Sequence, residues 1–154
     1  MKPDNSQVER FHFEIVELIK KYQFRDRNEM VCCGLSVSQC YTLETLNRFG
    51  TMSMKALADR MYLSISTITR VIEPLIKQKF VVRKDDKSDR RVKLVRLTRK
   101  GENVVAESWK NVFRSEQIIL QNFPGEHREL FIEFLQKLNQ AFGNWKESRC
   151  NYNK

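Results

Sequence analysis

Short hydroxylated side chains and a guanidinium lie close together in residues 64–77, in a segment whose apolar residues recur at helical spacing. At 100° per residue one side of this helix carries Ile65, Ile68, Val71, Ile72, Leu75 and Ile76. The other side carries Ser66, Thr67, Arg70 and Lys77, and Ser64 is expected to cap the start. Hydroxyl groups and a guanidinium on one helix face can contact base edges and phosphates in a DNA major groove. The alternative is an ordinary amphipathic helix whose hydroxyl groups only cap it.

A basic hairpin is predicted directly after this helix. Two β-prone runs, 80–84 and 91–97, flank a polar tip at 85–90. The hairpin carries Arg83, Lys84, Lys87, Arg90, Arg91, Lys93 and Arg96. A basic hairpin behind a groove-reading helix is a wing, and a tip arginine can enter the narrow, strongly negative minor groove. Asp89 is expected to orient the Arg91 guanidinium by a charge-assisted hydrogen bond.

The positive charge of the chain is concentrated in the same region. The net charge is +9, and residues 51–100 hold 14 Lys and Arg against 5 Asp and Glu, while the remaining residues hold 14 of each. A basic block in an otherwise neutral chain indicates a defined surface for a polyanion. The alternative is a solvated basic face.

The elements that must position these residues can be predicted from periodicity and capping signals. Ser36 and Gln39 form a capping-box pattern that opens a helix ending at Gly50, and Ser53 is expected to cap a short helix to Met61. Further helices are expected over 6–27, 98–122 and 126–147, with a break at 123–125. The predicted fold class is mainly α with a small β-hairpin wing: a winged helix-turn-helix between N- and C-terminal dimerisation helices. We predict a DNA-binding lobe at 35–101 and a helical dimerisation region at 1–34 and 102–154.

From about residue 35 to 101 the sequence resembles the MarR family of bacterial transcriptional regulators. The matching residues are Leu35-Ser36, Gln39 and the run MSMKALADRMYLSISTITRVIEPLIKQKFVVRKDDKSDRRVKLVRLTRKG. The resemblance implies that Ser66, Thr67, Thr69 and Arg70 read the major groove, and it matches Asp89 and Arg91 to the family's wing tip. The predicted DNA-binding residues are therefore Ser64, Ser66, Thr67, Thr69, Arg70, Lys77, Lys87, Asp89, Arg90 and Arg91.

Two positions depart from the family pattern. Pro74 falls inside the predicted groove-reading helix, where it removes a backbone hydrogen bond and should bend the helix. Phe80 stands where the family usually has a glycine at the end of that helix, so the corner before the wing is expected to differ.

Dimerisation is expected because one helix and wing cover few base pairs, whereas two copies read a palindrome about one helical turn apart. The terminal helices carry more apolar surface than one small domain buries. Interface candidates are Phe11, Phe13, Ile15, Trp109, Phe113, Phe131, Phe134, Leu138, Phe142 and Trp145. The alternative is that some of them form the core of one subunit. Family resemblance also implies dimerisation through the first and last helices.

Cys32, Cys33 and Cys40 lie within nine residues, which is dense for a reduced chain. They can be small buried side chains, an oxidation sensor, or thiolate ligands of a soft metal or metalloid. The paired CxxC spacing of structural zinc is absent, and no other cofactor is expected. Cys33, just before a helix start, is where thiolate is favoured.

The sequence predicts a sequence-specific double-stranded DNA-binding regulator, a homodimeric repressor released by an oxidant, a soft metal or metalloid, or a small organic ligand. The alternative is an architectural DNA-binding protein without an effector. A thiol enzyme using Cys33 is not expected, because no histidine base is near it in sequence and no phosphate loop or hydrolase motif occurs. With no apolar run of eighteen residues and no leader pattern, we expect a cytoplasmic protein without membrane partners.

Overall fold

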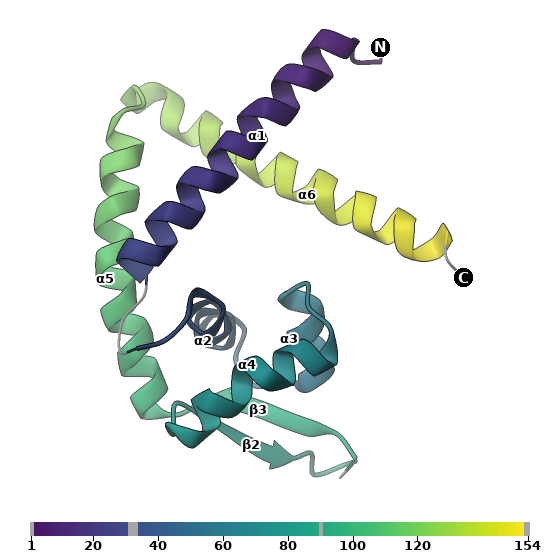
Figure 1. Ribbon diagram of the computed structural model, residues 1–154, viewed down its shortest axis with the longest axis vertical. Helices are drawn as coiled ribbons and strands as arrows, with labels where there is room; N and C mark the ends of the chain where they lie inside the picture. The colour runs from purple at the N-terminus through teal and green to yellow at the C-terminus, as the bar shows by residue number, and fades with distance from the viewer. Residues whose placement is uncertain (1, 31–33, 90, 153–154) are drawn as a thin grey trace. The chain divides into compact units, whose positions relative to one another are not determined.

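The protein is built mainly from α-helices, with a small antiparallel sheet, so the predicted fold class is confirmed (Figure 1). The computed structural model describes residues 2–30, 34–89 and 91–152. Two compact units are formed by Met1–Phe113 and Arg114–Lys154. In chain order the elements are α1 (Asn5–Arg25), the π-helix η1 (Asp26–Met30), α2 (Val37–Phe49), β1 (Met52–Ser53), α3 (Met54–Arg60), α4 (Ile65–Lys77), β2 (Val81–Asp85), β3 (Lys93–Leu97), α5 (Arg99–Gln121), the 3-10 helix η2 (Gly125–His127) and α6 (Arg128–Tyr152).

The helix starts follow the capping signals of the sequence. Ser36 and Gln39 form the predicted capping box, in which the Ser36 hydroxyl accepts the Gln39 N–H at 3.3 Å and the Gln39 side chain accepts the Ser36 N–H at 2.8 Å. Ser53 accepts the Ala56 N–H at 3.1 Å and so caps α3. These bonds satisfy N–H groups that have no partner inside their own helix, which fixes where α2 and α3 begin.

One core holds α2, α3, α4 and the sheet together. It includes the fully buried Leu43, Leu57, Ile68, Ile72, Leu75 and Val95. Each such side chain contributes about 1.5–3 kcal/mol by leaving water. The outer face of α4 is thereby held in a fixed orientation relative to the hairpin.

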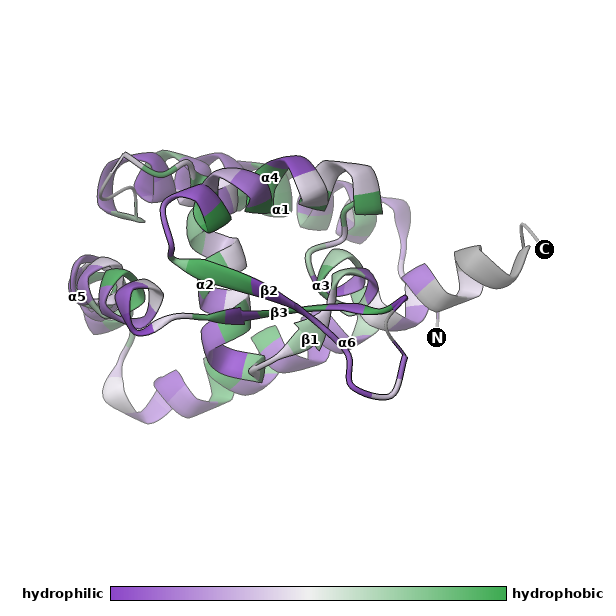
Figure 2. Ribbon diagram, turned by 90° about the horizontal axis from the view of Figure 1, so that it is seen from below, coloured by the Kyte–Doolittle hydropathy of each residue, from purple (hydrophilic) through white to green (hydrophobic). Residues whose placement is uncertain are grey.

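The sheet has three strands in the order β1-β3-β2, and all neighbours are antiparallel. Strands β2 and β3 form the predicted hairpin, and β2 changes from hydrophobic near the core to hydrophilic toward the tip (Figure 2). The short strand β1 pairs Met52 with Val95 and Ser53 with Leu94. This third strand, which we did not predict, joins the hairpin to the start of α3.

The last turn of α1 continues into a π-helix that carries a buried carboxylate. Asp26 is 3% exposed, accepts a hydrogen bond from the Tyr41 hydroxyl of α2, and pairs with Arg25 at 3.1 Å. Burial raises the pKa of Tyr41, and the hydrogen bond to Asp26 raises it further. The contact ties the end of the first helix to α2.

Both helices of the helix-turn-helix end in a Schellman motif without glycine. At the end of α4, the Lys79 N–H donates to Ile76 O and the Phe80 N–H to Leu75 O, both at 2.9 Å, with Lys79 at φ 63°. At the end of α3, Leu63 donates to Ala58 O at 3.0 Å, with Tyr62 at φ 54°. The left-handed conformation that favours glycine therefore falls on Lys79, whereas the family pattern placed the glycine position one residue later, at Phe80. Phe80 itself is buried in the core.

Replacing Lys79 by glycine is expected to raise the free energy of unfolding by about 0.5–1 kcal/mol. Glycine adopts the left-handed conformation without the Cβ clash, and this gain exceeds the entropy that glycine adds to the unfolded chain. Urea unfolding measures the change. The control is Lys77→Gly, the same substitution at a right-handed position inside α4, which should lower stability by about 1 kcal/mol. Equal effects of the two variants would contradict the assignment.

The remaining helices form the second unit. It contains the end of α5, the turn at Gly125–His127 and the whole of α6, where Phe123 stacks on Phe131 with ring centroids 4.3 Å apart. Within the described part of the chain, no helix combines the length and the apolar character needed to cross a membrane.

Candidate nucleic-acid interface

The first turn of α4 presents a cluster of hydroxyl groups. Ser64 caps the helix by accepting the Thr67 N–H at 3.1 Å. Its hydroxyl also lies 2.9 Å from Ser66 Oγ and 2.8 Å from Thr67 Oγ1. These three residues stand at the N-terminus of α4, the positive end of the helix, where phosphate oxygens are favoured.

The two faces of α4 separate almost as the periodicity predicts. Ile68, Ile72 and Leu75 are fully buried, whereas Arg70 and Lys77 are exposed. Ile65 is the exception: it was placed on the apolar side, but it is 53% exposed because it lies in the first turn, beyond the core.

Thr69 differs from the other hydroxylated residues of α4. Its Oγ1 donates to the Ile65 carbonyl one turn earlier, at 2.7 Å, and the side chain is half-buried. This back-bond uses the hydroxyl proton and leaves the oxygen lone pairs as acceptors for a base amino group.

The hairpin tip is ordered by carboxylates that bond the backbone. Asp86 accepts the Ser88 N–H at 2.7 Å and the Asp89 N–H at 3.2 Å. The Ser88 hydroxyl also donates to it, and this bond is the largest cause of the lowered pKa of Asp86. Asp86 is a tip-shaping residue that we did not predict, although an Asx turn in the run Asp85-Asp86-Lys87-Ser88 is its sequence signal.

Asp89 acts on the backbone of Arg91. Its Oδ1 accepts the Arg91 N–H at 2.9 Å, a contact that differs from the predicted bond to the guanidinium. It holds the turn from which Arg91 projects, and Lys87, Asp89 and Arg91 are all exposed. Arg90, the other predicted tip arginine, lies outside the described residues.

The structure describes one of the three candidate thiols, Cys40. Cys32 and Cys33 lie outside the described residues. Cys40 is 6% exposed, and its thiol donates a hydrogen bond to the Met30 carbonyl, with 3.5 Å between Sγ and the oxygen. Among residues 2–30, 34–89 and 91–152, no three histidine, cysteine or acidic side chains are grouped to hold a metal.

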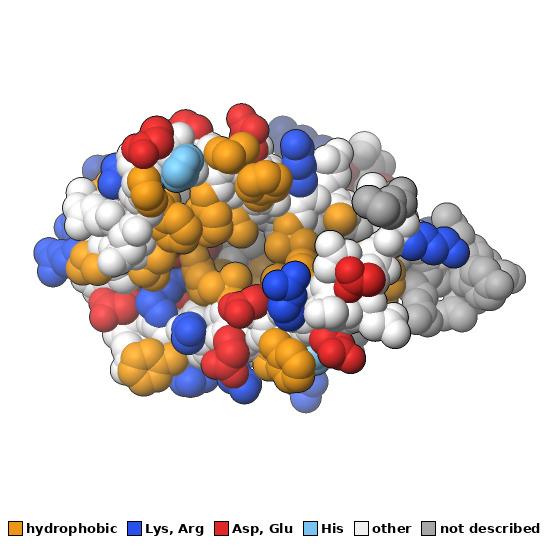
Figure 3. Space-filling model, turned by 90° about the horizontal axis from the view of Figure 1, so that it is seen from above, with side chains coloured by type: hydrophobic (Ala, Val, Ile, Leu, Met, Phe, Trp, Pro, Cys, Tyr) orange, Lys and Arg blue, Asp and Glu red, His pale blue; other side chains and the backbone are white. Residues whose placement is uncertain are grey.

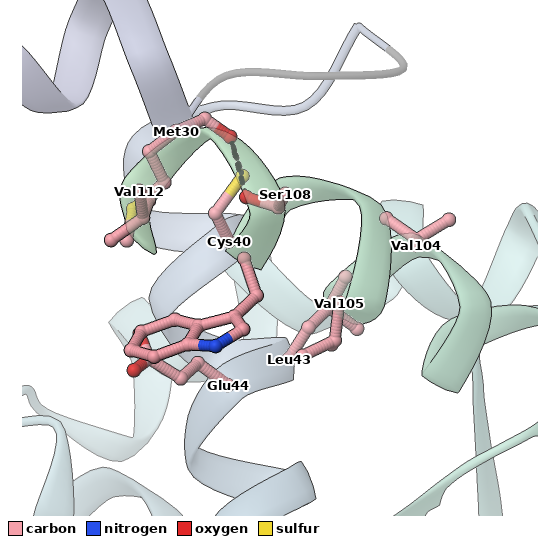
Figure 4. A pocket seen from close by; sticks show the side chains of 9 residues that line it. Met30, Cys40, Leu43, Glu44, Val104, Val105, Ser108 and Val112 are labelled. Atoms are coloured by element: carbon pink, nitrogen blue, oxygen red, sulfur yellow. Dashed lines mark hydrogen bonds between the residues drawn. The ribbon is translucent and has the colours of Figure 1, made fainter. Parts of the chain in front are cut away.

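A narrow cleft lies between α2 and the first half of α5, within the unit Met1–Phe113 (Figure 4). Its lining residues are Met30, Cys40, Leu43, Glu44, Val104, Val105, Ser108, Trp109 and Val112. The space open to water-sized molecules is about 20 Å³, room for about one water. Ser108 Oγ donates to the Met30 carbonyl at 2.8 Å. Burial raises the pKa of the half-buried Glu44 carboxyl, while Arg48 lowers it.

Large apolar side chains are exposed on the terminal helices (Figure 3). On α1 they include Val8, Phe11, Leu18 and Ile19, and on α6 Leu130, Phe134, Phe142 and Trp145. Of the predicted interface residues in these two helices, Ile15, Phe131 and Leu138 are half-buried. Isolated apolar residues on a surface are ordinary, whereas these residues form rows at helical spacing on both helices.

Known proteins share both the sequence pattern and the fold. The model of the MarR family matches residues 35–93. The chain is 32% identical to the HTH-type transcriptional regulator YxaD of Bacillus subtilis, over 88% of this chain and 94% of the relative. A MarR family protein from Bacillus stearothermophilus has the same fold, with a TM-score of 0.82 at 23% identity, covering 92% of this chain and 99% of that one. A MepR-like protein, solved with pseudoligands, is 30% identical with a TM-score of 0.61, covering 88% and 95%.

Proposed function

The chain belongs to the MarR family of winged helix-turn-helix transcriptional regulators, a family without enzymatic activity, and we propose that it is a homodimeric repressor of a palindromic operator. The observation that carries the proposal is the exposed hydroxyl and arginine face of α4 beside a basic hairpin whose tip is ordered around Arg91. The helix supplies contacts to base edges in the major groove, and the wing arginine enters the adjacent minor groove. Footprinting on the DNA upstream of its own gene tests the assignment. Equal affinity for unrelated DNA would favour the architectural alternative.

Replacing Arg91 by alanine is expected to weaken operator binding by roughly 1–3 kcal/mol, because a desolvated contact in the minor groove is lost. Arg91 is exposed in the free protein, so the melting temperature should not change. Arg10→Ala removes an exposed arginine from α1 and serves as the matched control. Fluorescence anisotropy with labelled operator measures both variants. Unchanged affinity of a folded Arg91 variant would remove the wing from the interface.

An effector that enters the cleft between α2 and α5 is proposed to release the repressor from DNA. Anything larger than a water molecule has to part these helices, because the free space is so small. Helix α2 packs against α4 and β3, so a displacement of α2 reaches the elements that contact DNA. The apolar lining favours a small organic ligand, and the MepR-like relative was solved with pseudoligands.

A thiol-based effector remains the second candidate, through oxidation or a soft metal or metalloid at Cys32, Cys33 and Cys40. The burial of Cys40 and its hydrogen bond to Met30 oppose its direct attack on an oxidant, since reactive thiolates are partly exposed. We therefore expect a Cys32→Ser, Cys33→Ser, Cys40→Ala variant to keep its response to organic ligands. Operator binding with and without peroxide, a soft metal or a phenolic acid measures this. If the variant alone loses release by peroxide or the metal, the thiols are the sensor.

A further inference from the structure

Tyr62 lies in the turn between α3 and α4, in a backbone conformation that is unfavourable for residues with a side chain. Its φ is 54°, in the left-handed region where glycine is free and an aromatic residue is strained. The side chain is 74% exposed, so packing in the core does not compensate for this strain. The Schellman motif at the end of α3 imposes this conformation, and strained residues cluster at functional sites, which directs attention to what the tyrosine side chain does there.

A stacked arginine lies two residues earlier. The Arg60 guanidinium carbon is 3.8 Å from the centre of the Phe49 ring, and that of Arg48 is 5.3 Å from the same centre. All three residues are exposed. A guanidinium held over an aromatic ring keeps its N–H donors for other partners, and their fork geometry is suited to two hydrogen bonds with a phosphate.

Both features adjoin the elements assigned to DNA. Arg60 is the last residue of α3, and Tyr62 lies two residues before Ser64, which caps α4. Phe49, under the guanidinium, ends α2 just before β1, and β1 pairs with the wing strand β3. In a helix-turn-helix the first helix crosses the DNA backbone while the second enters the groove. The exposed groups of this turn are thus beside the start of the groove-reading helix.

We propose that Arg60 and Tyr62 bind backbone phosphates beside the groove that α4 enters. This inference rests on the proposed function and adds contacts outside the recognition helix and the wing. The Arg60 guanidinium donates two N–H bonds to one phosphate, and the Tyr62 hydroxyl donates to a phosphate oxygen. Phosphate contacts carry no sequence information, so their contribution is the same on every DNA and depends on salt.

Tyr62→Gly separates the two roles of the tyrosine, because it should change stability and affinity in opposite directions. The melting temperature should rise by a few degrees as the backbone strain is relieved. Operator affinity should fall about tenfold as the hydrogen bond to a charged group is lost. Tyr62→Phe should leave the melting temperature unchanged and show the same loss of affinity. A more stable Tyr62→Gly variant with wild-type affinity would overturn the role of Tyr62.

Arg60→Gln is compared with Arg10→Gln, which removes the same charge from the exposed face of α1. The Arg60 variant should weaken binding to operator and to scrambled DNA by the same factor. It should also reduce the slope of log affinity against log salt by about one per protomer, because a phosphate contact no longer releases a counterion. The Arg10 variant should leave both quantities unchanged. A change confined to the operator, or equal slopes for the two variants, would overturn the role of Arg60.

The wild-type protein distinguishes the failure of this inference from the failure of the proposed function. If wild type binds its operator and the Arg60 and Tyr62 variants match it in affinity and salt slope, only the turn contacts are wrong. If wild type shows no preference for operator over scrambled DNA, the assignment as a sequence-specific repressor fails, while a uniform loss in both variants still supports the phosphate contacts.

Discussion

Replacing Phe134 by glutamate is expected to leave the protomer folded, to prevent dimerisation and thereby to reduce operator binding at least about 100-fold. Phe134 is 58% exposed in the single chain, so its removal costs the protomer little packing. In a dimer the glutamate carboxylate would be buried against apolar side chains, where an unpaired charge costs several kcal/mol. A monomer presents one recognition helix and wing, and it loses the gain from two linked half-sites.

Gln140→Glu is the matched control, because it adds the same charge to α6 on the side opposite the apolar row. Analytical ultracentrifugation at micromolar concentration should find a dimer for wild type and for the Gln140 variant, and a monomer for the Phe134 variant. Circular dichroism should find all three folded. A Phe134 variant that remains dimeric places the interface elsewhere, and a monomeric wild type that binds its palindrome contradicts the dimer proposal itself.

Local signals in the sequence were sufficient to predict most elements of the DNA-binding lobe. Ser36 with Gln39, Ser53 and Ser64 each cap the helix they were expected to cap. The hydrogen bonds of these caps join residues at most three apart, so their pattern can be recognised without tertiary structure. The same holds for the hairpin, whose strands are close in sequence.

Features that depend on distant contacts could not be predicted in this way. Strand β1 has only two residues, and it exists because Met52 and Ser53 meet β3 about forty residues later. The exposure of Ile65 depends on where the core ends, which a helical period does not contain. The hydrogen bond between Tyr41 and the buried Asp26 depends on how α1 approaches α2. The roles of the site residues in DNA contact remain predictions, since geometry alone does not test them.

The corner between α4, the wing and α5 explains why a glycine follows the wing. The Thr98 N–H donates to the Phe80 carbonyl at 3.0 Å, and the Thr98 hydroxyl donates to Lys79 O at 2.7 Å and accepts the Gly101 N–H at 3.1 Å. A Cβ on Gly101 would lie 2.2 Å from the Phe80 carbonyl oxygen and 3.2 Å from Leu97 Cδ2. The first turn of α5 can therefore pack against the end of α4 only where residue 101 has no side chain.

Gly101→Ala is accordingly expected to lower the free energy of unfolding by about 3 kcal/mol, or about 10 °C in melting temperature. The atom that the new methyl group meets is backbone, so the clash is relieved only by moving Phe80 and straining the bonds of Thr98. Because Phe80 joins α4 to β2, the same movement should weaken operator binding in the fraction that stays folded. Gly143→Ala is the control: it lies inside α6 with open space at its Cβ and should raise stability by about 0.5–1 kcal/mol. A Gly101 variant as stable as wild type would show that the corner tolerates a side chain, and would leave the glycine at this position without a structural reason.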